Sequence, residues 1–235
     1  ELHNTISSYG LQCHHAYFGQ ILDSAELMEA LEAYIESCAY LGIKQICVWG
    51  PWPFESSSDR HQIPKASDIW QKEVEGFFTA MTQVLPKAEK AAVTLELKPH
   101  RGVGRSGESL RETHRKLGSR SFGVCYDPGN VHYYEGLDPK FDVEYVADIA
   151  TCFVAKDHVG GQGNPVFGTP GDGDLPLERV LMSLAQGGFA GPVINERVDV
   201  LGASNVDYQN RRAYSHLEAI CTAVERRIEE GCRTA

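Results

Sequence analysis

Apolar residues along this chain follow two spacings, short continuous runs and longer stretches with helical periodicity. Continuous runs rich in valine, isoleucine and leucine predict buried strands, whereas apolar residues three and four positions apart predict amphipathic helices. The runs predict six strands, at residues 11–16, 43–49, 93–98, 122–127, 152–157 and 193–196. Helical spacing predicts a helix that opens with a capping box of Asp23 and Glu26 and ends before Gly42, an earlier one that ends before Gly10, and further helices at residues 67–91, 109–117, 143–149, 174–186 and 213–228. Strands and helices therefore alternate throughout the chain.

Two polar segments lie between the predicted strands and helices and are typical of turns. Asp127-Pro128-Gly129-Asn130 follows the fourth run and has the composition of a tight turn. Gly171-Asp172-Gly173-Asp174 lacks the lysine and the spacing of a phosphate-binding loop. We interpret it as a turn in which Asp174 caps the following helix.

Alternating strands and helices imply right-handed βαβ units and a parallel sheet. A closed (β/α)8 barrel needs eight strands and typically about 250 residues, whereas six strands are predicted here. The chain opens inside a predicted helix, so we expect a TIM-barrel type fold that lacks its first two strands. Residues 1–235 are expected to form one such domain, with an open doubly wound sheet as the rival.

Composition and charge reduce the number of function classes that fit this chain. The chain of 235 residues has a formal net charge of −10, which argues against nucleic acid as a partner. No apolar run is long enough to span a bilayer, so no membrane role is expected. Seven cysteines without CxxC spacing suit reduced thiols in a cytoplasmic protein. Small-molecule chemistry fits these features best.

Ionisable residues that can bind metal stand at the carboxyl ends of four predicted strands. Glu96, Asp127, His158 and Glu196 each stand at or just after the end of an apolar run. Ligands gather at the carboxyl ends of parallel strands, and four such ends favour a barrel over the single switch point of an open sheet. The pattern predicts a divalent cation site in an α/β enzyme.

At these strand ends the chain resembles the sugar phosphate isomerase/epimerase superfamily, the xylose isomerase-like barrels. The likeness runs from Tyr9 to Arg197, and its most specific pieces are Leu95-Glu96-Leu97-Lys98-Pro99-His100, Tyr126-Asp127-Pro128-Gly129-Asn130, Lys156-Asp157-His158, Gly171-Asp172-Gly173-Asp174, Gly188-Phe189-Ala190-Gly191 and Glu196. The family's first two strands have no counterpart here.

The resemblance implies one divalent metal ion, held by Glu96, Asp127, Glu196 and a histidine. Relatives usually carry that histidine where this chain has Val154. His158 shares strand parity with Val154 and is the expected substitute, with His132 and His100 as alternatives, whereas a purely local role would have His158 bond its own loop. Carboxylates and one imidazole suit Mn²⁺, Mg²⁺ or Co²⁺.

The resemblance also implies a reaction. A carbohydrate would lose the proton beside its carbonyl and pass through an enediolate, with Glu96 and Glu196 as the catalytic acid/base pair. A lyase or dehydratase acting on a keto-sugar or keto-inositol is the nearest alternative. A non-catalytic sugar-binding barrel is a third, because Val154 replaces the usual histidine. Homo-oligomerisation is left open.

Further residues that follow or flank the metal positions are candidate substrate contacts. A simpler interpretation exists for each: solvated rim residues, aromatic core packing for the tryptophan, or an ion pair of Lys156 with Asp157. Adjacent residues of a strand point to opposite faces, so at most one of His14 and His15 is expected to enter the site. The predicted contacts are Lys98, His100, Asn130, His132, Lys156, Arg197, Trp49 and His15.

Overall fold

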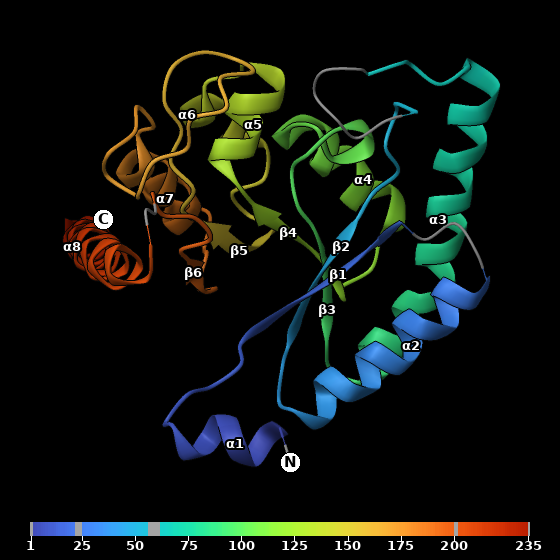
Figure 1. Cartoon of the computed structure of the whole chain (residues 1–235), viewed down its shortest axis with the longest axis horizontal. Helices are drawn as coiled ribbons and strands as arrows, with labels where there is room; N and C mark the ends of the chain where they lie inside the picture. The colour runs from blue at the N-terminus through green and yellow to red at the C-terminus, as the bar shows by residue number, and fades with distance from the viewer. Residues whose placement is uncertain (1, 22–24, 56–61, 200–201, 235) are drawn as a thin grey trace. The chain divides into compact units, whose positions relative to one another are not determined.

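The computed structural model describes residues 2–21, 25–55, 62–199 and 202–234 (Figure 1). Within these ranges strands and helices alternate as predicted. Asp23 of the expected capping box lies outside them. The strands are β1 (His15–Ile21), β2 (Gln45–Trp49), β3 (Thr94–Leu97), β4 (Phe122–Tyr126), β5 (Ala150–Val154) and β6 (Val193–Ile194). The helices are α1 (Leu2–Ser8), α2 (Ala25–Tyr40), α3 (Ser67–Lys90), α4 (Gly107–Leu117), α5 (Pro128–Glu135), α6 (Pro139–Asp142), α7 (Leu177–Gln186) and α8 (Ala203–Thr234), with short 3₁₀ turns η1 (Gly102–Gly104) and η2 (Val143–Tyr145).

The chain forms two compact units, each described here by itself. The first comprises residues 1–104 and 112–123. Its strands β1, β2 and β3 are parallel and follow one another in chain order. Helix α2 contacts β1 and α3, and α3 contacts β3. Phe77, Met81, Val84 and Ala88 recur on one side of α3 and are buried, so burial of an apolar stripe explains why this segment is helical.

The second unit comprises residues 105–111 and 124–235. Strand β5 lies between β4 and β6, and both pairings are parallel. Helices α7 and α8 contact each other. Their buried apolar residues recur at helical spacing: Val180, Leu181 and Leu184 in α7, and Ala213, Leu217, Ile220 and Val224 in α8. This packing holds the segments that follow β5 and β6.

The first predicted strand is displaced in the structure. We expected it at residues 11–16, but β1 begins at His15, where it pairs with Gln45, and runs to Ile21. The prediction stopped at Ala16, whereas Tyr17, Phe18 and Ile21 also pair with residues of β2. Partner strand β2, rather than local hydrophobicity, therefore decides where β1 lies.

The predicted turn at Asp127-Pro128-Gly129-Asn130 is instead the start of α5. Asp127 is the N-cap, and its Oδ1 accepts a hydrogen bond of 2.9 Å from the backbone N–H of Asn130. Proline is well suited to the first helical position because its fixed φ is helical and its missing N–H would have had no helical partner. The same residues that suggest a turn thus open a helix here, which carries Asn130 and His132.

Three other predictions near the site need correction. Asp174 does not cap α7, which has no side-chain cap; its carboxylate accepts from Gly160 N at 2.7 Å. The helix expected at residues 143–149 is only the 3₁₀ turn η2. Strand β5 ends at Val154, and Lys156 N donates to Val154 O at 2.8 Å. Because the chain turns there, strand parity with Val154 says nothing about where His158 points.

Six cysteines in the described part are free thiols, and four of them are buried: Cys38, Cys47, Cys125 and Cys152. They pack as small core residues. None of the helices described here combines the length and the apolar composition needed to cross a bilayer.

Candidate functional site

The first unit places a buried carboxylate against an imidazole. Glu96 lies in β3 and is fully buried. Its Oε2 is 2.7 Å from Nε2 of His15, whose side chain is only 5% exposed. His14 is exposed, so one of the two adjacent histidines enters the site, as alternation along a strand predicts. Burial of both partners away from water strengthens this contact.

Aromatic and basic side chains also lie at or after strand ends of the same unit, and the Tyr17 ring is 5.1 Å from that of His15. Lys98 follows β3, is 4% exposed, and its Nζ lies 5.8 Å from the centre of the Tyr17 ring. The His100 ring is 5.4 Å from that of Trp49 and 6.5 Å from that of Trp52. Of the predicted contacts, Lys98 and His100 follow β3 and Trp49 is the last residue of β2, where its ring lies beside the His100 imidazole.

In the second unit, one ammonium group joins three predicted site residues. Lys156 Nζ lies 3.0 Å from Asp127 Oδ2, 2.5 Å from Glu196 Oε1 and 3.0 Å from Asn130 Oδ1. Asp127 is fully buried, and the side chain of Glu196 is 31% exposed. Lys156 therefore pairs with Asp127 and Glu196, and the ion pair with Asp157 that the sequence suggested does not form.

His158 is buried, and both of its ring nitrogens have neighbours within hydrogen-bond distance. Nδ1 is 2.8 Å from Nδ1 of His132, and Nε2 is 2.7 Å from the backbone oxygen of Asn164. Burial, followed by the charge of His158, lowers the pKa of His132. In this arrangement His158 bonds its own loop, so a metal would have to displace one of these contacts to use the imidazole.

Arg197 stands beside an aromatic ring that sequence reasoning missed. Its guanidinium lies 4.6 Å from the centre of the Phe167 ring, and Lys156 Nζ lies 5.7 Å from the same centre. Phe167 belongs to the glycine-rich loop between β5 and α7, where no hydrophobic periodicity marks it. A cation over an aromatic face is attracted by the negative charge of the π system.

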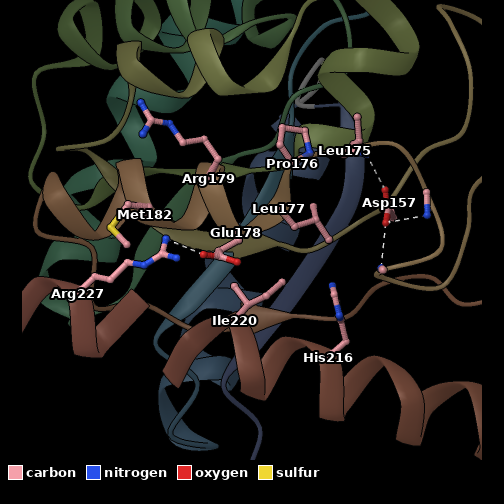
Figure 2. Close-up of a pocket in the computed structure, with 12 residues that line it drawn as sticks. Asp157, Leu175, Pro176, Leu177, Glu178, Arg179, Met182, His216, Ile220 and Arg227 are labelled. Atoms are coloured by element: carbon pink, nitrogen blue, oxygen red, sulfur yellow. Dashed lines mark hydrogen bonds and ion pairs between the residues drawn. The ribbon is translucent and has the colours of Figure 1, made fainter. Parts of the chain in front are cut away.

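Asp157 organises the loop that precedes α7. Its carboxylate accepts backbone N–H bonds from His158, Gly171, Gly173 and Leu175 at 2.9–3.2 Å. Figure 2 shows Asp157 at one side of an open pocket of about 450 Å³ between α7 and α8. At the other side Arg227 pairs with Glu178 at 2.7 Å. The carboxylate of Asp157 therefore accepts hydrogen bonds from backbone N–H groups of its own loop, a role that the neighbouring residues in the sequence did not indicate.

The buried carboxylate of Asp142 supports the end of β4. The N–H of Gly107 is shared between both carboxylate oxygens of Asp142, at 2.9 Å from each, and the Tyr126 hydroxyl donates to Oδ2 at 3.0 Å. Burial raises the pKa of Asp142 above its ordinary value, despite the lowering effect of these donors. Burial, followed by the charge of Asp142, also raises the pKa of Tyr126. This network holds the strand that delivers Asp127.

The donor set suits a divalent cation of the hard type. Asp127 and Glu196 offer carboxylate oxygens, the ligands that Mg²⁺ and Mn²⁺ prefer. The same two carboxylates already hold an ammonium ion, which shows that their arrangement accommodates positive charge. The predicted grouping of Glu96 with Asp127 and Glu196 combines residues of both units and stays a prediction.

Comparison with known proteins defines the class. Residues 1–219 match the family model of the xylose isomerase-like TIM barrel, and the chain belongs to that family. The resemblance and the expected barrel fold are confirmed. No curated protein sequence matches the chain.

Solved structures share the fold at low sequence identity. A D-tagatose 3-epimerase-like protein has a TM-score of 0.73 and 18% identity over 97% of this chain and 83% of its own. The 3-keto-D-glucoside 4-epimerase of E. coli has a TM-score of 0.72 and 16% identity over 94% and 83%. A xylose isomerase-like barrel from Mycobacterium smegmatis, in complex with magnesium, has a TM-score of 0.75 and 10% identity over 94% and 77%.

Proposed function

We propose that this protein is a sugar isomerase or epimerase that moves a proton at the carbon next to a carbonyl. The family and the epimerases among the structural neighbours support this class. The observation that carries the proposal is the buried contact of 2.7 Å between Glu96 and His15. A carboxylate held in a dry site beside an imidazole is suited to accept a proton and to return it.

Each of the site residues described above has a proposed role. Glu96 removes the proton, and His15 orients its carboxylate through Nε2. Glu196 is the second acid/base group, and its partial exposure leaves it accessible to a sugar. Trp49 and His100 would flank the sugar ring in one unit. Lys98, Asn130, His132, Lys156 and Arg197 remain candidate contacts to its hydroxyls.

A divalent ion, Mn²⁺, Mg²⁺ or Co²⁺, is part of the proposal. Glu96, Asp127 and Glu196 are the proposed ligands, with His158 the least supported because both of its nitrogens have other neighbours. When bound, such an ion would polarise the substrate carbonyl and favour loss of the adjacent proton.

Deuterium exchange tests the proposal directly. The chain is incubated in D₂O with Mn²⁺ and a panel of free and phosphorylated ketoses, and products are followed by NMR and mass spectrometry. We expect an epimer or isomer with deuterium beside the carbonyl. Glu96→Gln should abolish exchange, whereas Glu89→Gln, at an exposed glutamate of α3, should not. Retained exchange in Glu96→Gln would disprove the role of this residue.

The same assay separates the alternatives. A product that has lost water identifies a lyase or dehydratase. Sugar binding in calorimetry without exchange or product identifies a non-catalytic barrel.

A further inference from the structure

The ammonium group of Lys156 lies among oxygen atoms of the protein. Its side chain is 7% exposed, and the three nearest oxygens come from Asp127, Glu196 and Asn130, at 3.0, 2.5 and 3.0 Å. An ammonium has three N–H donors and no acceptor, so three oxygens match its bonding capacity. Two of the oxygens belong to carboxylates, whose negative charge attracts the ammonium.

The surrounding backbone is shaped for this side chain. A Cβ at Gly129 would lie 2.7 Å from Lys156 O and 2.8 Å from Lys156 Cγ, so only glycine lets α5 approach the lysine stem. Asn130 is anchored in turn, because its N–H donates to Asp127 Oδ1 at 2.9 Å. Asp127, Asn130 and Lys156 thus form a closed ring of contacts, and the lysine is held there by the fold.

The two carboxylates, Asp127 and Glu196, are the ones that the proposed function assigns to a divalent ion. One position between the same carboxylates cannot hold an ammonium and a divalent ion together, because like charges at contact distance repel strongly in a buried place.

We propose that Lys156 is the resident cation of the Asp127–Glu196 pair and that a divalent ion binds there only by displacing its ammonium. Lys156 then sets the metal affinity of the site. This inference rests on the proposed metal ligands, but it concerns binding rather than turnover. It differs from a substrate contact, since it requires no sugar.

Metal titration without substrate tests the inference. Mn²⁺ binding is measured by calorimetry for the wild type, Lys156→Met and Lys65→Met. Lys65 is a matched control because its ammonium also pairs with a carboxylate, that of Glu73 at 2.7 Å, in the other unit. Lys156→Met should bind Mn²⁺ at least about tenfold more tightly than the wild type, because the competing charge-assisted contacts are gone. Lys65→Met should bind within about twofold of the wild type.

Thermal unfolding provides a second readout. Without metal, Lys156→Met should unfold on the order of 5–10 °C below the wild type, because a buried carboxylate loses its counter-charge. Mn²⁺ should restore much of this loss in unfolding temperature. It should raise the unfolding temperature of the wild type less than that of Lys156→Met. Equal or weaker Mn²⁺ binding by Lys156→Met, or failure of all variants to bind Mn²⁺, would overturn the inference.

A measurement on the wild type covers the case in which Lys156→Met does not fold. The side-chain NMR signal of Lys156 is identified by its loss in Lys156→Arg and followed during titration with Mg²⁺. We expect this signal to shift as Mg²⁺ saturates the site. A signal that stays unchanged at saturation would overturn the inference.

Two outcomes separate failure of the inference from failure of the proposed function. Ketose turnover by the wild type with unchanged Mn²⁺ affinity in Lys156→Met contradicts only the role of Lys156. Tighter Mn²⁺ binding in Lys156→Met without turnover of any ketose contradicts only the proposed function.

Discussion

His15 Nε2 and Glu96 Oε2 lie 2.7 Å apart, although the two residues are 81 positions apart in the sequence. Both side chains are nearly or fully buried. The contact joins β1 to β3 across β2, so it exists only because the three strands are parallel neighbours.

Removing this imidazole should impair proton transfer. His15→Ala leaves the buried Glu96 carboxylate without its oriented partner, and we expect kcat/KM for deuterium exchange to fall by about 10²–10⁴-fold. His14→Ala is the matched control, because His14 is adjacent but exposed. It should stay within about threefold of the wild type. Equal losses in the two variants would contradict the assigned role.

The raised pKa of Asp142 predicts a pH-dependent stability term. The folded state keeps the proton to higher pH than the unfolded state, whose carboxyl has the ordinary value of 3.8. The term is therefore fully present below that value and is lost as pH rises through the folded pKa.

Urea unfolding from about pH 3.5 to about pH 7 measures the term as a difference between the wild type and Asp142→Asn. We expect the free energy of unfolding of the wild type, relative to the variant, to decrease with pH and then level off. A relative stability that increases with pH would show that the hydrogen bonds from Gly107 and Tyr126 outweigh burial.

Asp157 should contribute to stability through its four backbone contacts. Asp157→Asn replaces one acceptor oxygen by an amide group that faces N–H donors, so we expect a loss of about 2–4 kcal/mol in the free energy of unfolding. Asp172 lies in the same loop as Asp157 and forms a partly exposed ion pair with Arg212 of α8. Asp172→Asn removes this pair and should lower the free energy of unfolding by only about 0–1 kcal/mol. Hydrogen exchange of the Gly171, Gly173 and Leu175 amides should accelerate only in Asp157→Asn.

Gly173 is required by the close approach of Asp157. A Cβ at this position would lie 2.2 Å from Asp157 Oδ1, whereas a Cβ at Gly161, in the same stretch between β5 and α7, meets nothing within 4 Å. We expect Gly173→Ala to lower the free energy of unfolding by roughly 1–3 kcal/mol and Gly161→Ala to change it by less than about 0.5 kcal/mol. Similar values for both would mean that the loop relaxes around the added methyl group.

Sequence patterns predicted most elements but not all of their limits. Helix α3 was predictable because Phe77, Met81, Val84 and Ala88 repeat at helical spacing, a local signal of burial. Strand β1 was misplaced because its partner β2, not its own composition, selects the paired residues. Asp127-Pro128-Gly129-Asn130 suits both a turn and a helix N-terminus, and only the continuation through Val131 and Tyr133 into the core decides for α5.

The sequence by itself determined the alternation of strands and helices, the barrel family, and the acids that follow the strands, because burial and turn chemistry act over a few neighbouring residues. Tertiary structure alone decided the partners of those residues. His15 meets Glu96, Lys156 meets Asp127 and Glu196, and Asp157 binds backbone amides. Such contacts depend on strand pairing and on loops that return from distant positions, and no local pattern of residues encodes them.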